Sequence, residues 1–144
     1  MTSDVFDSIN GVLVNLYAVF LKTQNYHWNI TGENFSSNHK LLDEQYNGYI
    51  TLIDELAEHL RYHNFKVTLS FNNMKSMVFI GEINNDLGSK DMIKDLLKSI
   101  ETLYQNIEKA FQLCQSESLE SSSDIMLSLI KHLEQNIYHL RSSI

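Results

Sequence analysis

The chain contains no proline in its 144 residues and only five glycines. Proline ends or kinks a helix because it has no amide hydrogen and its ring clashes with the preceding turn. Glycine weakens a helix because it loses more backbone entropy on folding than other residues. Such a chain can form helices that run uninterrupted over many turns. Hydrophobic residues make up 43% of it, which predicts a buried core in a single domain spanning residues 1–144.

Four segments carry apolar residues at helical spacing, and we expect each of them to form a long helix. The first is expected over residues 4–27 and the second over residues 36–63, with a break at residues 29–34 between them. The third is expected over residues 89–114 and the fourth over residues 121–141, separated by a serine-rich break. Glycine, asparagine and serine in these breaks favour turns over continued helix.

Residues 64–88 form the connection between the two helical pairs. Phe65, Val67, Leu69 and Phe71 alternate with polar residues as in a strand, but a single strand would have no partner in this chain. We therefore interpret the segment as a long connection with a short helix near residues 73–79. Four helices with a long connection between the second and the third predict an all-α fold, the ferritin-like four-helix bundle.

Composition narrows the class of protein further. Cys114 is the only cysteine, so no intrachain disulfide can form, and residues 1–10 contain no lysine or arginine and do not resemble a secretion signal. No unbroken apolar run reaches the roughly 18 residues that span a bilayer. We expect a cytoplasmic protein that does not enter membranes. Its net charge of −7 favours cations over nucleic acid as ligands.

The second helix has a set of possible metal ligands on one face. At 100° per residue, His39, Asp43, Asp54 and Glu58 fall within about 100° of one another, on the side opposite the apolar stripe. The stripe comprises Leu41, Leu42, Tyr49, Leu52, Ile53, Leu56 and Leu60. A di-iron site inside such a bundle uses inward-facing ligands and the spacing Glu-x-x-His, which is absent here. A site inside the bundle is therefore not expected.

These four residues cannot surround one metal within one chain. His39 and Glu58 are separated by about 28 Å along the helix axis. If two copies of the helix crossed antiparallel about a two-fold axis near residues 48–49, His39 and Asp43 of one copy would face Glu58 and Asp54 of the other. The symmetric contact would create two such sites about 22 Å apart. The apolar side chains between them are Tyr46, Ile50 and Ala57.

The predicted site combines one imidazole with three carboxylates, and His27 stands close by at the end of the first helix. Mixed nitrogen and oxygen donors suit iron, whereas the absence of thiolates disfavours copper(I) and structural zinc. Taken singly, each carboxylate could instead be a solvated surface group. Taken singly, His27 could be a turn or core histidine.

Three motifs carry a resemblance to a known family. Residues 22–32 read KTQNYHWNITG, residues 35–46 read FSSNHKLLDEQY, and residues 54–58 read DELAE. These runs resemble the Dps patterns K-T-x-x-[FY]-H-W-N-[VI]-x-G, F-x-x-x-H-x-[LM]-[LF]-[DE]-x-x-Y and D-E-[ILV]-A-E. Residues 124–127 and 137–141 resemble shorter pieces near the end of that family. The sequence is similar to the Dps mini-ferritins over most of its length.

The resemblance implies an enzyme, a ferroxidase that oxidises Fe(II), preferably with hydrogen peroxide. It implies iron ligands from two subunits, with His27 and His39 from one, Asp54 and Glu58 from its two-fold mate, and Asp43 as a further ligand. It also implies a dodecamer built from two-fold dimers, which stores ferric iron inside a hollow shell and protects the cell from oxidative stress. Trp28 would lie near the site as a sacrificial electron donor, with core packing as the alternative role.

Other positions are expected to have lesser roles or depart from the pattern. By the same resemblance, Glu117, Glu120 and Asp124 would line a pore for iron, with helix capping as the alternative. His59 stands where the family has arginine, and we expect His59 and His63 to be an exposed surface pair, with metal binding by this i,i+4 pair as the alternative. The family's L-G-G-x-P turn is missing after them, so the connection that follows can be built differently.

A DNA-coating nucleoid protein without significant ferroxidase activity is the alternative function. Relatives of this kind that bind DNA directly use a basic tail, but the first basic residue here is Lys22 and three residues follow Arg141. Lys90, Lys94 and Lys98 form a stripe interrupted by aspartates, as on a solvated helix face. Neutralising phosphates requires clustered cations, so we expect no direct DNA binding.

Overall fold

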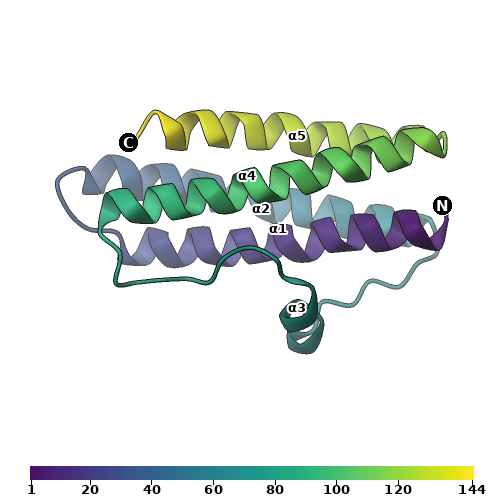
Figure 1. The fold of residues 1–144 in the computed structure, drawn as a ribbon, viewed down its shortest axis with the longest axis horizontal. Helices are drawn as coiled ribbons and strands as arrows, with labels where there is room; N and C mark the ends of the chain where they lie inside the picture. Colours follow the sequence, from purple (N-terminus) through teal and green to yellow (C-terminus); the bar gives the residue numbers. More distant parts are fainter.

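The computed structural model describes residues 1–144 and contains five helices and no strand (Figure 1). The helices are α1 (Ser3–Asn29), α2 (Phe35–Tyr62), α3 (Phe71–Met77), α4 (Ser89–Ser116) and α5 (Glu120–Arg141). The four long helices and the short one are confirmed, each with ends within two residues of the expected positions. The segment with strand-like alternation forms extended chain and α3.

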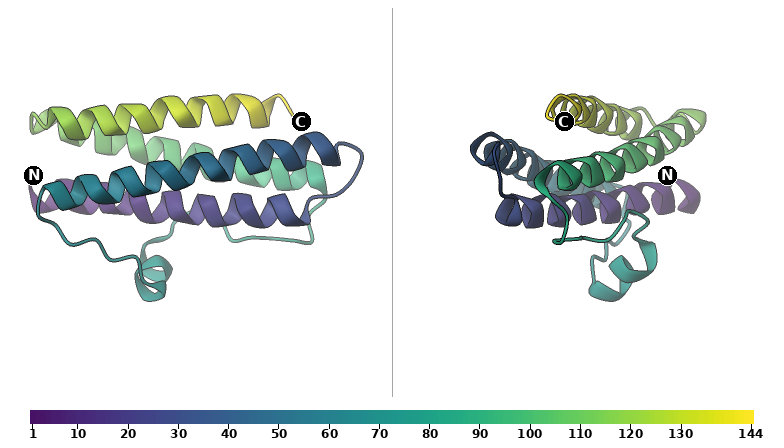
Figure 2. Two further views of the ribbon diagram at one scale, coloured as in Figure 1. Left: turned by 180° about the vertical axis from the view of Figure 1, so that it is seen from behind. Right: turned by 60° about the vertical axis from the view of Figure 1, so that its left-hand side comes forward.

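The four long helices lie side by side and form two antiparallel pairs (Figures 1 and 2). Helix α1 is antiparallel to α2, and α4 is antiparallel to α5, because short turns join each pair. Helices α2 and α4 run in the same direction, so the connection between them travels back along the length of the bundle. The all-α four-helix bundle with a long connection, including its short helix, is therefore confirmed.

The core is a single cluster of apolar side chains drawn from all four long helices. Helix α1 is the most enclosed, because it packs against α2, α4 and α3. By length and composition it is also the one helix that could cross a membrane. In this bundle its apolar side chains instead form part of the core, including Val5, Ile9, Leu13 and Leu16, which are fully buried.

Helix α2 buries most of its predicted inner face. Its fully buried apolar side chains are Leu42, Tyr49, Leu56 and Leu60. Leu41, Leu52 and Ile53, which belong to the same predicted stripe, are half-buried at its edges. The inner face is therefore narrower than predicted, and the opposite side of α2 remains uncovered by the chain's own helices.

A buried lysine fastens the long connection to the bundle. Lys22 on α1 is 1% exposed, and its Nζ lies 2.8 Å from Asp95 Oδ2 on α4 and 3.0 Å from Ser99 Oγ. The same Nζ donates to the carbonyl oxygen of Gly81 in the connection at 2.9 Å. One buried cation thus joins two helices and the connection, with charge-assisted hydrogen bonds that offset its desolvation.

Tyr26 strengthens the same attachment. Its hydroxyl donates to Asp95 and accepts a hydrogen bond from the amide of Asn84 at 3.2 Å. Burial, followed by the neighbouring Asp95 carboxylate, raises the pKa of Tyr26 to about 12. The hydroxyl therefore stays protonated at neutral pH and holds the final part of the connection.

Asn15 holds the connection beside α3. Its Nδ2 donates to the carbonyl oxygen of Met77 at 3.1 Å, and its Oδ1 accepts from the amide of Phe79 at 2.9 Å. This side chain is fully buried and supplies the backbone of the connection with partners that a helix or sheet would otherwise provide.

Replacing Lys22 should loosen the connection. Lys22→Met removes the charge that pairs with Asp95, and breaking a buried pair typically costs 3–5 kcal/mol. Because Asp95 is partly exposed, we expect a loss of about 2–3 kcal/mol in the free energy of unfolding, measured with urea. Protease cleavage near residues 81–84 should also become faster. Lys75→Met, at an exposed position on α3, is the control. Equal free energies of unfolding for Lys22→Met and Lys75→Met would contradict the role of Lys22 in attaching the connection.

The half-buried ring of His132, whose Nε2 atom is buried, should make stability depend on pH. His132 on α5 packs so close to α2 that a Cβ at Gly48 would lie 3.0 Å from its ring, and burial lowers its pKa below the usual 6.5. Its neutral form is favoured in the folded state, so this contribution to stability is present above pH 6.5 and is lost as pH falls through the folded pKa. Melting temperatures of His132→Gln should therefore fall less than those of the wild type between about pH 7 and pH 5.

The control for this experiment is His139→Gln, a partly exposed histidine two turns further along the same helix. It should follow the wild-type pH dependence. Parallel pH profiles for His132→Gln and the wild type would show that burial of residue 132 does not govern the acid response.

Candidate metal centre

His27 and His39 hold each other in place where α1 ends and α2 begins. Nδ1 of His27 lies 2.8 Å from the carbonyl oxygen of His39, and Nδ1 of His39 lies 2.9 Å from the carbonyl oxygen of His27. A carbonyl oxygen can only accept, so each Nδ1 must carry the hydrogen. In the neutral rings each Nε2 then keeps its lone pair, which is the form that binds a metal.

The two imidazole rings are also stacked. Their centroids are 3.9 Å apart with an interplanar angle of 20°. His27 is nearly buried, whereas His39 is half-buried. The short turn at residues 30–34 brings the two helix ends together, and the reciprocal hydrogen bonds fix both tautomers and restrain the two rings. The two Nε2 atoms are thereby prepared as candidate nitrogen donors without a metal being present.

Asp43 is the third predicted ligand near this pair. Its Oδ1 lies 3.8 Å from His27 Nε2. Nδ2 of Asn47, one turn along α2, donates to the Asp43 carbonyl oxygen at 2.8 Å and approaches Oδ1 at 3.3 Å. The nearby Asp43 carboxylate, ahead of burial, raises the pKa of Tyr46. Asn47 and the Tyr46 hydroxyl were not predicted from the sequence, although their spacing from Asp43 offered a clue.

Asp54 and Glu58 lie elsewhere on α2, exposed on its outer side. No three histidine, cysteine, aspartate or glutamate side chains of one chain are grouped closely enough to hold a metal ion. Glu58 Oε2 accepts a hydrogen bond of 3.3 Å from the Tyr62 hydroxyl. The charge of Glu58 is the main reason why the pKa of Tyr62 is raised. The structure thus brings His27, His39 and Asp43 together and leaves Asp54 and Glu58 apart.

The outer side of α2 between these two groups is apolar and hollow. Ile50 is 49% exposed, and a shallow hollow of about 400 Å³ is lined by Ile50, Thr51, Ile53, Asp54 and Ala57. The hollow thus places apolar side chains beside one of the predicted ligands, Asp54, on the outer side of α2.

Trp28 lies beside the histidines but points outward. Its side chain is 65% exposed, so the alternative that it packs in the core is wrong. Residue 28 is one position after His27, and the helical turn of about 100° per residue directs successive side chains to different sides. Its role as an electron donor stays a prediction.

The predicted pore residues gather where α4 ends and α5 begins. Glu117, the residue after α4, accepts a hydrogen bond of 2.7 Å from the Thr2 hydroxyl. Glu120 is the first residue of α5, and Asp124 lies one turn later beside a small hollow that also includes Glu55. Glu120 and Asp124 are exposed and make no ion pair within the chain.

The expectation of an exposed histidine pair at residues 59 and 63 is wrong. His59 is buried, and its Nε2 lies 2.8 Å from the Ser122 hydroxyl of α5. Burial lowers the pKa of His59, and the neighbouring His63 lowers it further. His59 therefore joins α2 to the first turn of α5. The sequence could not reveal this because the partner lies 63 residues away.

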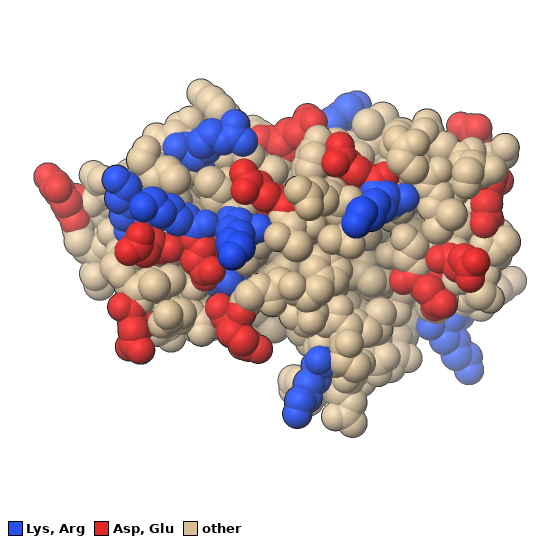
Figure 3. Space-filling view, viewed as in Figure 1, with Lys and Arg blue, Asp and Glu red and all other residues tan.

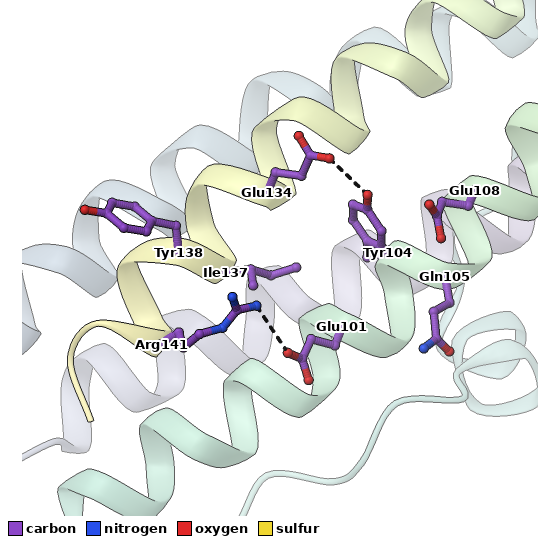
Figure 4. Close-up of a pocket in the computed structure, with 8 residues that line it drawn as sticks. All are labelled: Glu101, Tyr104, Gln105, Glu108, Glu134, Ile137, Tyr138 and Arg141. Carbon is purple, nitrogen blue, oxygen red and sulfur yellow. Dashed lines mark hydrogen bonds and ion pairs between the residues drawn. The ribbon is translucent and has the colours of Figure 1, made fainter.

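A larger hollow lies elsewhere, between α4 and α5 (Figure 4). It measures about 500 Å³, and its lining includes no candidate ligand. Two contacts cross it: the Tyr104 hydroxyl donates to Glu134 at 3.0 Å, and Arg141 lies 3.9 Å from Glu101. Burial, followed by Glu134, raises the pKa of Tyr104 to about 12. The metal centre predicted from the sequence is therefore separate from this hollow.

The arrangement of the four helices defines a ferritin-like protein. The model of the ferritin-like domain matches residues 6–144. The chain is 31% identical to the DNA protection during starvation protein of Helicobacter pylori, over 74% of this chain and 72% of the relative. It is 25% identical to DNA protection during starvation protein 2 of Bacillus anthracis, over 99% and 97% of the two chains. The chain belongs to the Dps family of ferritin-like proteins.

Solved structures support the same fold. Dps from Staphylococcus aureus superposes with a TM-score of 0.93 at 20% identity, covering 99% of this chain and 95% of the other. A Dps protein from Vibrio cholerae, described as a member of the ferritin-like diiron-carboxylate superfamily, gives a TM-score of 0.91 at 24% identity. It covers 97% of this chain and 88% of that one.

Proposed function

We propose that this protein is a ferroxidase of the mini-ferritin type, which oxidises Fe(II) and stores the ferric product. The observation that carries the proposal is the reciprocal hydrogen bonding of His27 and His39, which prepares two imidazole nitrogens for a metal. Imidazole together with carboxylates suits iron among the common metals. The relatives' names, which refer to protection during starvation, agree with a role in stress protection.

The site is completed by a second copy of the chain. His27, His39 and Asp43 supply one half, and Asp54 and Glu58 of the two-fold mate supply the other. The antiparallel register that sets residue 39 opposite residue 58 also sets residue 43 opposite residue 54. The exposed Ile50 and the hollow beside it would then lie within the contact, where burial of apolar surface stabilises association.

The chemistry requires little from the protein beyond holding iron and excluding side reactions. Two Fe(II) ions supply the two electrons that reduce one hydrogen peroxide, with two protons, to two water molecules. Because both electrons are available at one site, the peroxide is reduced without release of hydroxyl radical. Neutral histidines donate to the metal, and the carboxylates balance its charge as it rises from Fe(II) to Fe(III).

We further propose that twelve subunits, arranged as six two-fold dimers, form a hollow cytoplasmic shell that holds the ferric mineral. Iron would enter where α5 begins, past Glu120 and Asp124, with Glu117 near the opening. The exposure of the first two side chains supports such a path. Trp28, exposed next to His27, would act as a sacrificial electron donor when iron is scarce.

Complementation between two inactive variants tests the split site. One variant carries His27→Ala and His39→Ala, and the other carries Asp54→Ala and Glu58→Ala. Each alone should lose ferroxidase activity, measured as ferric absorbance after Fe(II) and hydrogen peroxide are added. Co-expressed and purified by two different tags, they should regain about a quarter of wild-type activity, because about half of the dimers that form by random pairing are mixed and each mixed dimer retains one intact site of two.

The mass of every sample in solution is the control, since both variants must assemble like the wild type. Mixed assemblies with no activity, or a wild-type protein that stays monomeric, would contradict a site shared between subunits. A wild-type protein that produces no ferric absorbance would contradict the ferroxidase function itself.

Direct DNA coating is the alternative function, and the surface charge argues against it. In Figure 3, lysine and arginine side chains gather where α4 begins and α5 ends, but aspartate and glutamate side chains lie among them. Lys94, for example, lies 3.6 Å from Asp91. Paired cations release few counterions from DNA, so they contribute little affinity.

A gel-shift experiment at low salt distinguishes the two functions. We expect the assembled protein to leave duplex DNA unretarded, because the net charge is −7 and lysines such as Lys94 lie beside acidic side chains. A variant with an added N-terminal lysine tail is the positive control and should retard the same DNA. Retention by the wild type would favour the nucleoid-coating function.

A further inference from the structure

Four aromatic rings form one continuous column through the candidate metal centre. Phe35 packs against His39 with centroids 4.9 Å apart and the rings tilted by 31°, and His39 stacks on His27 at 3.9 Å. His27 in turn meets the edge of Tyr46 at 5.3 Å. Three of the rings come from α2 and one, His27, comes from α1.

The spacing of these residues follows from helix geometry. Phe35 and His39 are four residues apart, so they lie one turn apart on the same side of α2. His39 and Tyr46 are seven residues apart, which is two turns or about 10.5 Å along the axis. That gap accommodates one further ring between them, and His27 fills it from the neighbouring helix. The spacing of Phe35, His39 and Tyr46 along α2 therefore leaves room in the column for the ring of His27.

The two histidines are restrained to different degrees. His27 has His39 on one side and Tyr46 on the other, and it is nearly buried. His39 is half-buried, in the first turns of α2, and the hydrogen bond from its Nδ1 allows the ring to tilt about that contact. Apart from His27, the one aromatic ring of this chain in contact with the His39 ring is that of Phe35.

We propose that Phe35 is a positioning residue for the metal centre, holding the His39 ring at the angle from which Nε2 meets the metal. Phe35 itself offers no metal ligand. Its side chain is 43% exposed although it is large and apolar, and packing in the core therefore does not account for it. The proposal deepens the function proposed above and rests on it, because it assigns a role at the same metal centre.

Co²⁺ is the probe for this role, because it prefers the same mixed nitrogen and oxygen donors and is not oxidised during the titration. Phe35→Leu removes the aromatic ring but keeps an apolar side chain. We expect its affinity for Co²⁺, measured by visible absorbance on the assembled protein, to fall about tenfold. That is the lower end of the effect typical for residues that orient metal ligands. Phe35→Trp, which restores an aromatic face, should recover most of the affinity.

Phe79→Leu is the matched control, since Phe79 is also 43% exposed and lies in the long connection. It should bind Co²⁺ like the wild type. Melting temperature and assembled mass are measured for all variants, and a purely structural role predicts that Phe35→Leu lowers stability without a selective loss of Co²⁺ affinity. The positioning role predicts that Phe35→Leu selectively loses Co²⁺ affinity while its stability stays like that of the wild type.

The outcomes separate this proposal from the proposed function. If the wild type binds Co²⁺ and His39→Ala does not, the metal centre stands. Wild-type Co²⁺ affinity in Phe35→Leu, or no recovery in Phe35→Trp, would then overturn the positioning role alone. If the wild type itself binds no Co²⁺ through His39, the metal centre fails and the positioning role fails with it.

Discussion

The pair of hydrogen bonds between the His27 and His39 rings and each other's backbone carbonyls is the contact on which the site depends. It joins the last turn of α1 to the first turns of α2 across a short loop. Without these bonds to the backbone the imidazole rings would not be held in one orientation, because a free imidazole rotates and changes tautomer. With both Nδ1 atoms committed to carbonyl oxygens, only the Nε2 atoms remain for a metal. The same contact joins the adjacent ends of the two antiparallel helices.

A second set of contacts holds the long connection against α1, away from the outer side of α2. Lys22 and Tyr26 fasten α1 to α4 and to the long connection, while Asn15 holds the connection beside α3. The connection therefore runs over α1 and does not cover the side of α2 that carries Asp43, Asp54 and Glu58. An antiparallel partner could approach this side, which a connection on the other side of the bundle would block.

Much of the candidate site could be predicted because its residues are close in sequence or on one helix. The shared face of His39, Asp43, Asp54 and Glu58 follows from 3.6 residues per turn. The nearness of His27 to His39 follows from a short break between two helices. In contrast, the burial of His59 against Ser122 depends on a contact between α2 and α5, which no local pattern encodes. The exposure of Trp28 depends on which side of α1 is covered, and the motif around it carries no information about that.

The five helices, their order and the outward face of α2 could be predicted from residue order alone, because helix formation and helical periodicity are local properties of the chain. The absence of proline and the spacing of apolar residues were sufficient for that. How the candidate ligands are held follows from the folded structure: the reciprocal histidine bonds, the column from Phe35 to Tyr46, and the Lys22 attachment all require atoms from separate elements to meet. Their geometry depends on how the helices pack, and packing is a property of the whole chain.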